Sequence, residues 1–154
     1  MKFLKNPFLL FLFGLAILSS CSSDDDNATA TETQIQIQIE NNVENGTWRI
    51  TTFIDSGEDE TNHFNAYNFT FNNSGTLNAT NGTNSYNGSW SITDSNSSSN
   101  SSDDLDFNIS FSSPPDFEEL SDDWDFISQS STKIELIDVS GGNGGTDYLT
   151  FEKN

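Results

Sequence analysis

From about residue 48 to the C-terminus, apolar and polar residues alternate in short runs that are separated by turn-rich segments. A period of two places successive side chains on opposite faces of a β-strand, so each run predicts a strand with one apolar face. The runs cover residues 48–54, 67–71, 77–79, 86–92, 105–111, 124–126, 134–136 and 149–151. Strands buried on both faces of a parallel sheet have nearly continuous apolar sequences instead. The pattern therefore predicts an antiparallel, all-β domain of about eight strands over residues 45–154.

Eight consecutive strands can close into an up-and-down barrel or split into a two-sheet sandwich. No amphipathic stretch of helical length separates the runs, which argues against an α/β fold. The chain has a single cysteine and so cannot form a disulfide within itself. Closure removes exposed strand edges without a disulfide, so we predict a single antiparallel barrel.

Residues 35–44 fit two interpretations. Glutamine and isoleucine alternate over residues 34–39, which predicts a strand, whereas Ile35, Ile39 and Val43 share one face of a helix. We favour a short helix or capping segment, because it would cover one mouth of the barrel. The preceding residues 22–34 have no large apolar side chain, and residues 21–34 are therefore predicted to form a flexible acidic tether.

The apolar positions of the strands carry many aromatic side chains. In the first run, Trp48, Ile50 and Ile54 share one parity, and Phe53 falls on the other face. The other aromatic residues of inward parity are Tyr67, Phe69, Phe71, Tyr86, Trp90, Phe107, Phe111, Trp124, Phe126 and Phe151. Each buries about 150–250 Å² when enclosed. Since an eight-stranded barrel is just wide enough for its own side chains or one small ligand, a packed aromatic core is favoured over an open pocket.

The alternative is a shallow ligand-binding cup near one end of the barrel. Its candidate wall is Tyr67, Tyr86, Trp90 and Trp124, because these rings are apolar while their polar tips can hydrogen-bond to a ligand or to water.

The N-terminus has the layout of an export signal. Lys2 and Lys5 precede an almost continuous apolar segment over residues 7–18, which is too short to span a bilayer comfortably. The segment ends in Leu18-Ser19-Ser20-Cys21, which resembles the lipobox of bacterial lipoproteins. The resemblance implies cleavage between Ser20 and Cys21, removal of residues 1–20, a diacylglycerol on the thiol and a further acyl chain such as palmitate on the new amine. Two or more acyl chains would anchor the protein stably to the bilayer.

The acidic residues 24–26 directly follow this anchor. They resemble the surface-export tag of lipoproteins in one group of Gram-negative bacteria, which implies the outer membrane and its outer face. A solvated tether would have the same composition, and this alternative stays open.

The formal charge of the chain is −19, and removing the two lysines of residues 1–20 leaves −21. Charge of this sign argues against nucleic acid as a partner and against a basic patch for anionic headgroups. The expected partners are therefore the bilayer, through acylated Cys21, and a small-molecule ligand. The protein is expected to be a monomer.

Gly46-Thr47-Trp48, at the start of the first predicted strand, resembles the Gly-x-Trp signature of lipocalins. The resemblance covers roughly residues 45–154 and implies that the glycine permits a close backbone approach and the tryptophan plugs the closed end of the barrel. Lipocalins tend to place an arginine of the last strand against this tryptophan. This chain has Lys153 there, and Arg49 adjoins Trp48 instead.

Catalytic and metal-binding patterns are weak. His63 is the only histidine and lies in an acidic loop, where a surface position is more common than a catalytic one. No second histidine or cysteine is present to build a zinc or thiol site, and no Gly-x-Ser-x-Gly motif occurs. We therefore expect no enzyme activity, no cofactor and no metal.

Calcium is the remaining alternative for a metal, because residues 103–107 and 122–126 both begin with paired aspartates at a loop-to-strand entry. Neither segment has the order of an EF-hand, and acids beside apolar strands also discourage edge pairing.

Two functions follow from this sequence. The first is a membrane-anchored extracytoplasmic lipoprotein whose lipocalin-like barrel binds a small apolar or glycan-like ligand. The second is a non-enzymatic surface interaction or structural protein with a filled aromatic core and acidic loops.

The anchor can be tested directly by mass spectrometry of the native N-terminal peptide. We expect the mature chain to begin at Cys21 with acyl chains on its sulfur and amine, because the lipobox directs both cleavage and lipidation. An unmodified thiol on Cys21 would refute the anchor.

Overall fold

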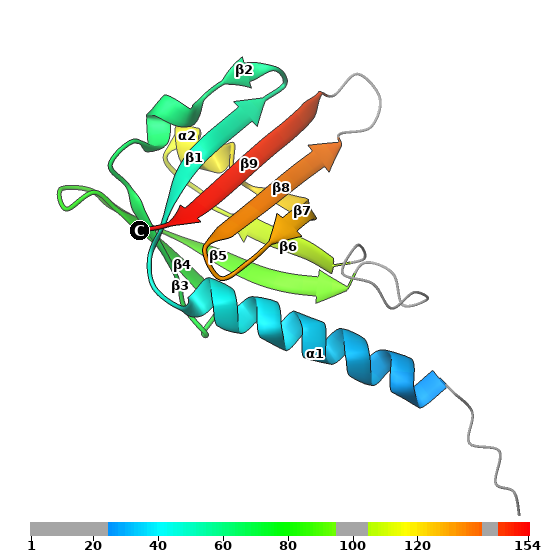
Figure 1. The fold of residues 1–154 in the computed structure, drawn as a ribbon. Helices are drawn as coiled ribbons and strands as arrows, with labels where there is room; N and C mark the ends of the chain where they lie inside the picture. The colour runs from blue at the N-terminus through cyan, green and yellow to red at the C-terminus, as the bar shows by residue number, and fades with distance from the viewer. Residues whose placement is uncertain (1–24, 95–104, 140–144) are drawn as a thin grey trace, which may run out of the picture.

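The computed structural model describes residues 25–94, 105–139 and 145–154 (Figure 1). The elements in chain order are α1 (Asp25–Glu44), β1 (Trp48–Asp55), β2 (Glu58–Asp59), η1 (Thr61–Phe64), β3 (Asn68–Phe71), β4 (Thr76–Thr80), β5 (Ser85–Asp94), β6 (Leu105–Ser110), α2 (Pro115–Glu118), β7 (Asp122–Gln129), β8 (Lys133–Val139) and β9 (Thr146–Lys153). The predicted signal peptide, the lipobox and Cys21 lie outside the described residues.

The strands form the predicted antiparallel barrel. They are hydrogen-bonded in the order β2-β1-β3-β4-β5-β6-β7-β8-β9, and a β1–β9 pairing closes the sheet on itself. The pairing of β1 with β9 extends from Trp48 opposite Lys153 to Ile54 opposite Tyr148, and β1 meets β3 where Trp48 lies opposite Phe69. Strand β2 is a short extra strand beside β1. The prediction of an up-and-down barrel of about eight strands is therefore confirmed.

A β-bulge changes which side chains of β1 point inward. Ile50 pairs with Phe151 and Thr52 with Thr150, so one extra residue is inserted between them. The insertion reverses the parity beyond it, because successive side chains alternate between the faces. The buried residue is consequently Phe53, which is 1% exposed, and Ile54 is only partly buried. The predicted inward orientation of Ile54 and outward orientation of Phe53 are wrong for this reason.

Helix α1 lies across one end of the barrel, which we call the α1 end (Figure 1). Ile39 and Val43 are buried in the core, as expected for a shared helical face. The side-chain amide of Gln36 donates a hydrogen bond to the carbonyl of Ile92 in β5 at 3.0 Å. The indole N–H of Trp48 donates to the carbonyl of Val43 at 2.8 Å. Of the two interpretations of residues 35–44, the structure has the helix.

The helix also begins earlier than expected. Residues 25–34 were predicted to belong to a flexible tether, but α1 starts at Asp25. Once the turns that carry the buried face have formed, adding further turns costs little, because nucleation is the expensive step of helix formation. A segment without large apolar side chains is thus helical here.

Aromatic rings fill the interior of the barrel. Of the ten inward aromatic residues of the prediction beyond the first run, seven are buried: Phe69, Phe71, Trp90, Phe107, Phe111, Trp124 and Phe151. The other three, Tyr67, Tyr86 and Phe126, are partly buried and pack against the same core. Many of these rings meet edge to face, such as Phe71 and Phe107 with centroids 5.5 Å apart.

Two further phenylalanines close the opposite end, which we call the α2 end because it carries α2 together with η1. Phe64 of η1 and Phe117 of α2 are both buried, and their ring centroids are 5.3 Å apart. Phe117 also contacts the rings of Phe69 and Phe111 at 6.1 and 5.1 Å. Neither phenylalanine lies in a strand, and together they join η1 and α2 to the core.

Replacing Phe117 with alanine should therefore destabilise the protein strongly. We expect the substitution to lower the free energy of unfolding by about 3–5 kcal/mol, because it leaves a cavity among several rings. Urea denaturation followed by tryptophan fluorescence measures the loss. The matched control is Ile127→Ala at a position that is 53% exposed, where a change within about 0.5 kcal/mol is expected. Equal losses in the two variants would contradict the packing of Phe117.

Candidate functional site

The four residues of the predicted ligand cup do not converge on one site. Tyr67 and Tyr86 lie together at the α2 end with ring centroids 5.9 Å apart. Trp90 lies toward the α1 end of the barrel, where its ring centroid is 5.4 Å from that of Phe71. Trp124 is buried in β7.

The tyrosine pair packs against the closed end of the core. Phe117 is 5.1 Å from the ring of Tyr67 and 4.9 Å from the ring of Tyr86, so this ring occupies the space where a cup would lie. A hydrogen bond between the two phenols raises the pKa of Tyr86, and partial burial and the charge of Asp116 act in the same direction. The partly exposed phenols therefore bond to each other.

The two tryptophans have structural partners. The indole N–H of Trp90 donates to the carbonyl of Asn72 at 2.9 Å, and that of Trp124 donates to the carbonyl of Leu120 at 3.1 Å. Both rings are buried. Each indole N–H that was expected to meet a ligand thus forms a hydrogen bond to a backbone carbonyl of a neighbouring turn.

The residues that resemble the lipocalin signature lie at the α1 end. Gly46 has a φ of +94°, and a Cβ there would lie 3.0 Å from Cε of Lys153, so only glycine fits without strain. The Lys153 ammonium lies 5.2 Å from the centroid of the fully buried Trp48 ring, which is a cation–π contact. Arg49 instead forms an exposed ion pair with Glu152 at 3.3 Å. The cation against Trp48 is therefore the lysine of the last strand.

The outer faces of β5, β6 and β7 form an open groove of about 530 Å³. Its polar lining consists mainly of short side chains: Ser89, Ser91, Asn108, Ser110, Ser121 and Asp123. Ser89 lies opposite Ser110, Ser91 opposite Asn108, and Asn108 opposite Asp123 across adjacent strands. The alternation that places aromatic rings inside thus places a patch of hydroxyl and amide groups outside. The sequence analysis did not identify this groove, because only the apolar face of each run was examined for ligands.

Gly88 brings two of these strands unusually close together. A Cβ at Gly88 would lie 2.4 Å from the carbonyl oxygen of Ser110 and 2.8 Å from the ring of Phe111. A larger residue would push β5 and β6 apart. The lack of a side chain at Gly88 therefore allows β5 to lie close to Ser110 and Phe111.

Asp122 lies at the inner rim of the groove, and its carboxylate accepts a hydrogen bond from the backbone N–H of Asp123 at 2.9 Å. Burial raises the pKa of Asp122, and the charges of Asp138 and Asp123 raise it further. Asp122 and Asp123 belong to the second of the two segments considered for calcium, residues 122–126, and this hydrogen bond engages one carboxylate oxygen of Asp122. Asp103 and Asp104, in the first such segment, lie outside the described residues.

A second, smaller hollow of about 200 Å³ lies between the C-terminal part of α1 and the barrel. Glu40 and Glu44 line it from the helix, and Gly75 and Ser91 line it from the strands and the β3–β4 turn.

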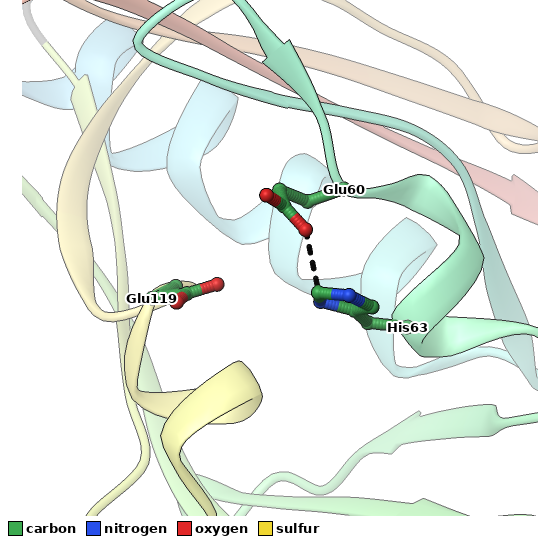
Figure 2. A group of neighbouring side chains, drawn as sticks. All are labelled: Glu60, His63 and Glu119. Atoms are coloured by element: carbon green, nitrogen blue, oxygen red, sulfur yellow. Dashed lines mark ion pairs between the residues drawn. The ribbon is translucent and has the colours of Figure 1, made fainter.

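One cluster of potential metal ligands occurs in the described part of the chain, and it lies at the α2 end (Figure 2). Glu60 precedes η1, His63 lies within it, and Glu119 directly follows α2. The Nδ1 atom of His63 is 3.1 Å from a carboxylate oxygen of Glu60, and one ligand atom from each of the three residues lies within 4.8 Å of the others. The sequence analysis missed the cluster because Glu119 is distant from His63 along the chain and only the fold brings them together.

No family model matches this chain, and neither does any curated protein. A solved structure of a DUF4847 family protein from Bacteroides vulgatus ATCC 8482 is similar, with a TM-score of 0.50 and 19% sequence identity. The alignment covers 75% of this chain and 97% of that one. At this level of identity the likeness concerns the fold. In the described part of the chain, no helix is both long and apolar enough to cross a membrane.

The raised pKa of Asp122 predicts a pH-dependent gain in stability for Asp122→Asn. Below the pKa that the Asp122 carboxyl has in the unfolded chain, this carboxyl is protonated in both the folded and the unfolded state, and the substitution should have little effect on stability. Above the folded pKa the ionised carboxylate destabilises the native state, so at pH 7 we expect the free energy of unfolding of the variant to exceed that of the wild type. The gain should be less than about 1 kcal/mol, because solvent screens a partly exposed carboxylate. Urea denaturation at pH 3 and pH 7 measures the difference. Asp125→Asn, exposed on the same strand, is the control, and an equal gain at both pH values would contradict the burial effect.

Proposed function

We propose that this chain is a lipid-anchored, extracytoplasmic binding module of a bacterial envelope, whose filled barrel binds a glycan-like ligand on its outer surface. The lipobox-like sequence at Leu18–Cys21 and the apolar segment before it support export and anchoring. Acidic residues 24–26, which resemble a surface-export tag, support a position on the outer face of the outer membrane.

We place the ligand on the outer surface because side chains fill the interior of the barrel. A carrier barrel of eight strands needs small inward side chains to leave room for a ligand. Here Phe151 contacts both Phe69 and Phe71 within the barrel, with ring centroids 5.4 and 5.5 Å apart. Phe117 fills the α2 end and α1 covers the other. A ligand would have to displace several of these rings to enter.

The groove on β5, β6 and β7 offers an alternative of suitable size, because ligand sites commonly have volumes of about 300–1,000 Å³. Serine hydroxyls, an asparagine amide and an aspartate carboxylate supply both donors and acceptors. Such groups can hydrogen-bond to the hydroxyl groups of a glycan, whereas an apolar molecule would leave them without partners. The proposed ligand class is therefore hydroxyl-rich and uncharged or cationic, since an anionic ligand would meet Asp123 and the net charge of the protein.

Filling the groove tests this proposal. We expect the intact chain to bind one or more oligosaccharides on a glycan array, and Ser110→Tyr to weaken that binding at least about tenfold, because the phenol occupies the space between β5 and β6. Ser128→Tyr is the matched control, since Ser128 is also exposed on the barrel exterior but does not line the groove. If the wild-type chain binds no glycan, or if both variants bind as the wild type does, the proposal is wrong.

A further inference from the structure

Basic residues are distributed very unevenly between the two ends of the barrel. The lysines and arginines after Cys21 are Arg49, Lys133 and Lys153, and all three lie at the α1 end, where β1 and β8 begin and β9 ends. The segments that form the α2 end instead carry Asp55, Glu58, Asp59, Glu60, Asp116, Glu118 and Glu119. His63 is the one histidine of the chain and lies among these acids. The α2 end therefore attracts cations.

We infer that Glu60, His63 and Glu119 bind a divalent transition-metal ion of the zinc class at this end of the barrel. The three residues supply one imidazole nitrogen and two carboxylates, and three protein ligands with water in the fourth position form a common open zinc site. Figure 2 shows the side chain of Glu119 directed toward the Glu60–His63 pair across a shared space.

The aromatic core holds the backbone segments that carry the ligands. Phe64 follows His63 and packs on Phe117, two residues before Glu119, with a centroid distance of 5.3 Å. The contact joins the two segments that carry the ligands. On the other side, the backbone N–H of Glu60 donates to the carbonyl of Phe53 at 3.0 Å. The site is thus built on buried neighbours, which lowers the entropy that metal binding would cost.

The distances require only a small adjustment. Zinc bonds of about 2.0–2.2 Å place tetrahedral ligand atoms roughly 3.3 Å apart. The Nδ1 atom of His63 and the carboxylate of Glu60 are already 3.1 Å apart. Glu119 must approach from within 4.8 Å, which a change of side-chain rotamer can supply. A zinc-bound imidazole nitrogen carries no proton, so any proton on the ligating nitrogen would pass to water on binding.

The cluster also brings two carboxylates together, because ligand atoms of Glu60 and Glu119 lie within 4.8 Å of each other. A bound dication would offset the repulsion between them.

The composition of the cluster favours zinc over calcium. Calcium takes six to eight oxygen ligands, whereas imidazole is a preferred ligand of zinc, copper, iron and nickel. The cluster offers two carboxylates and one nitrogen.

Calorimetric titration of the intact, untagged and chelator-treated chain with ZnCl₂ tests the inference. We expect one site with a dissociation constant that is roughly micromolar. His63→Gln and Glu119→Gln should each weaken binding at least about tenfold, because each removes a ligand. Glu118→Gln is the matched control: it removes the same charge from the adjacent position, outside the cluster, and should change the dissociation constant by less than about twofold.

A second measurement does not depend on any variant. Because His63 is the only histidine, its imidazole nitrogens give a single set of NMR signals. We expect Zn²⁺ to shift these signals at one equivalent, and Ca²⁺ to leave them unchanged. The inference would be overturned if Zn²⁺ left these signals unchanged or if Ca²⁺ competed equally well for the site. It would also be overturned if Glu118→Gln lost as much affinity for Zn²⁺ as Glu119→Gln, because that result indicates diffuse attraction of cations to the acidic end.

Discussion

The contact between Phe64 and Phe117 is the interaction on which the rest of this structure depends. It joins two segments outside the barrel strands, η1 and α2, and inserts both rings into one end of the core. Because the chain has one cysteine, no intrachain disulfide can hold these segments in place. The same contact has three consequences: it closes the α2 end, it fills the space beside Tyr67 and Tyr86, and it brings Glu119 near His63.

The other end of the barrel is closed by a different device. Helix α1 buries Ile39 and Val43, and its last turn accepts a hydrogen bond from the indole of Trp48. Lys153 covers the ring of Trp48, so the first and last strands are fixed together beside the helix. Because both ends are closed and rings fill the interior, we propose that recognition of other molecules takes place on the outside, at the groove across β5, β6 and β7 and at the acidic α2 end.

Much of this architecture could be predicted from the sequence, because alternating residues and turn signals act locally. The strands, the closed barrel and most of the aromatic core follow from that pattern. The bulge in β1 could not be predicted, since nothing in the run around Thr51 distinguishes an inserted residue from a regular strand. Phe117 lies in the one-turn helix α2 and Glu119 directly follows it, in a segment between strands that has no strand periodicity. The closed end and the His63 cluster therefore depend on tertiary contacts. The four residues of the predicted cup have the right chemistry for a ligand, but the fold separates them and satisfies their polar groups internally.

The central claim is that aromatic side chains fill the interior of the barrel. A crystal of the protein under xenon pressure tests it most directly, because xenon enters dry apolar cavities that water avoids. We predict no xenon density among Phe69, Phe107 and Trp124. Xenon density between these rings would contradict the filled core, and with it the proposal that the protein binds its ligand on the outer surface.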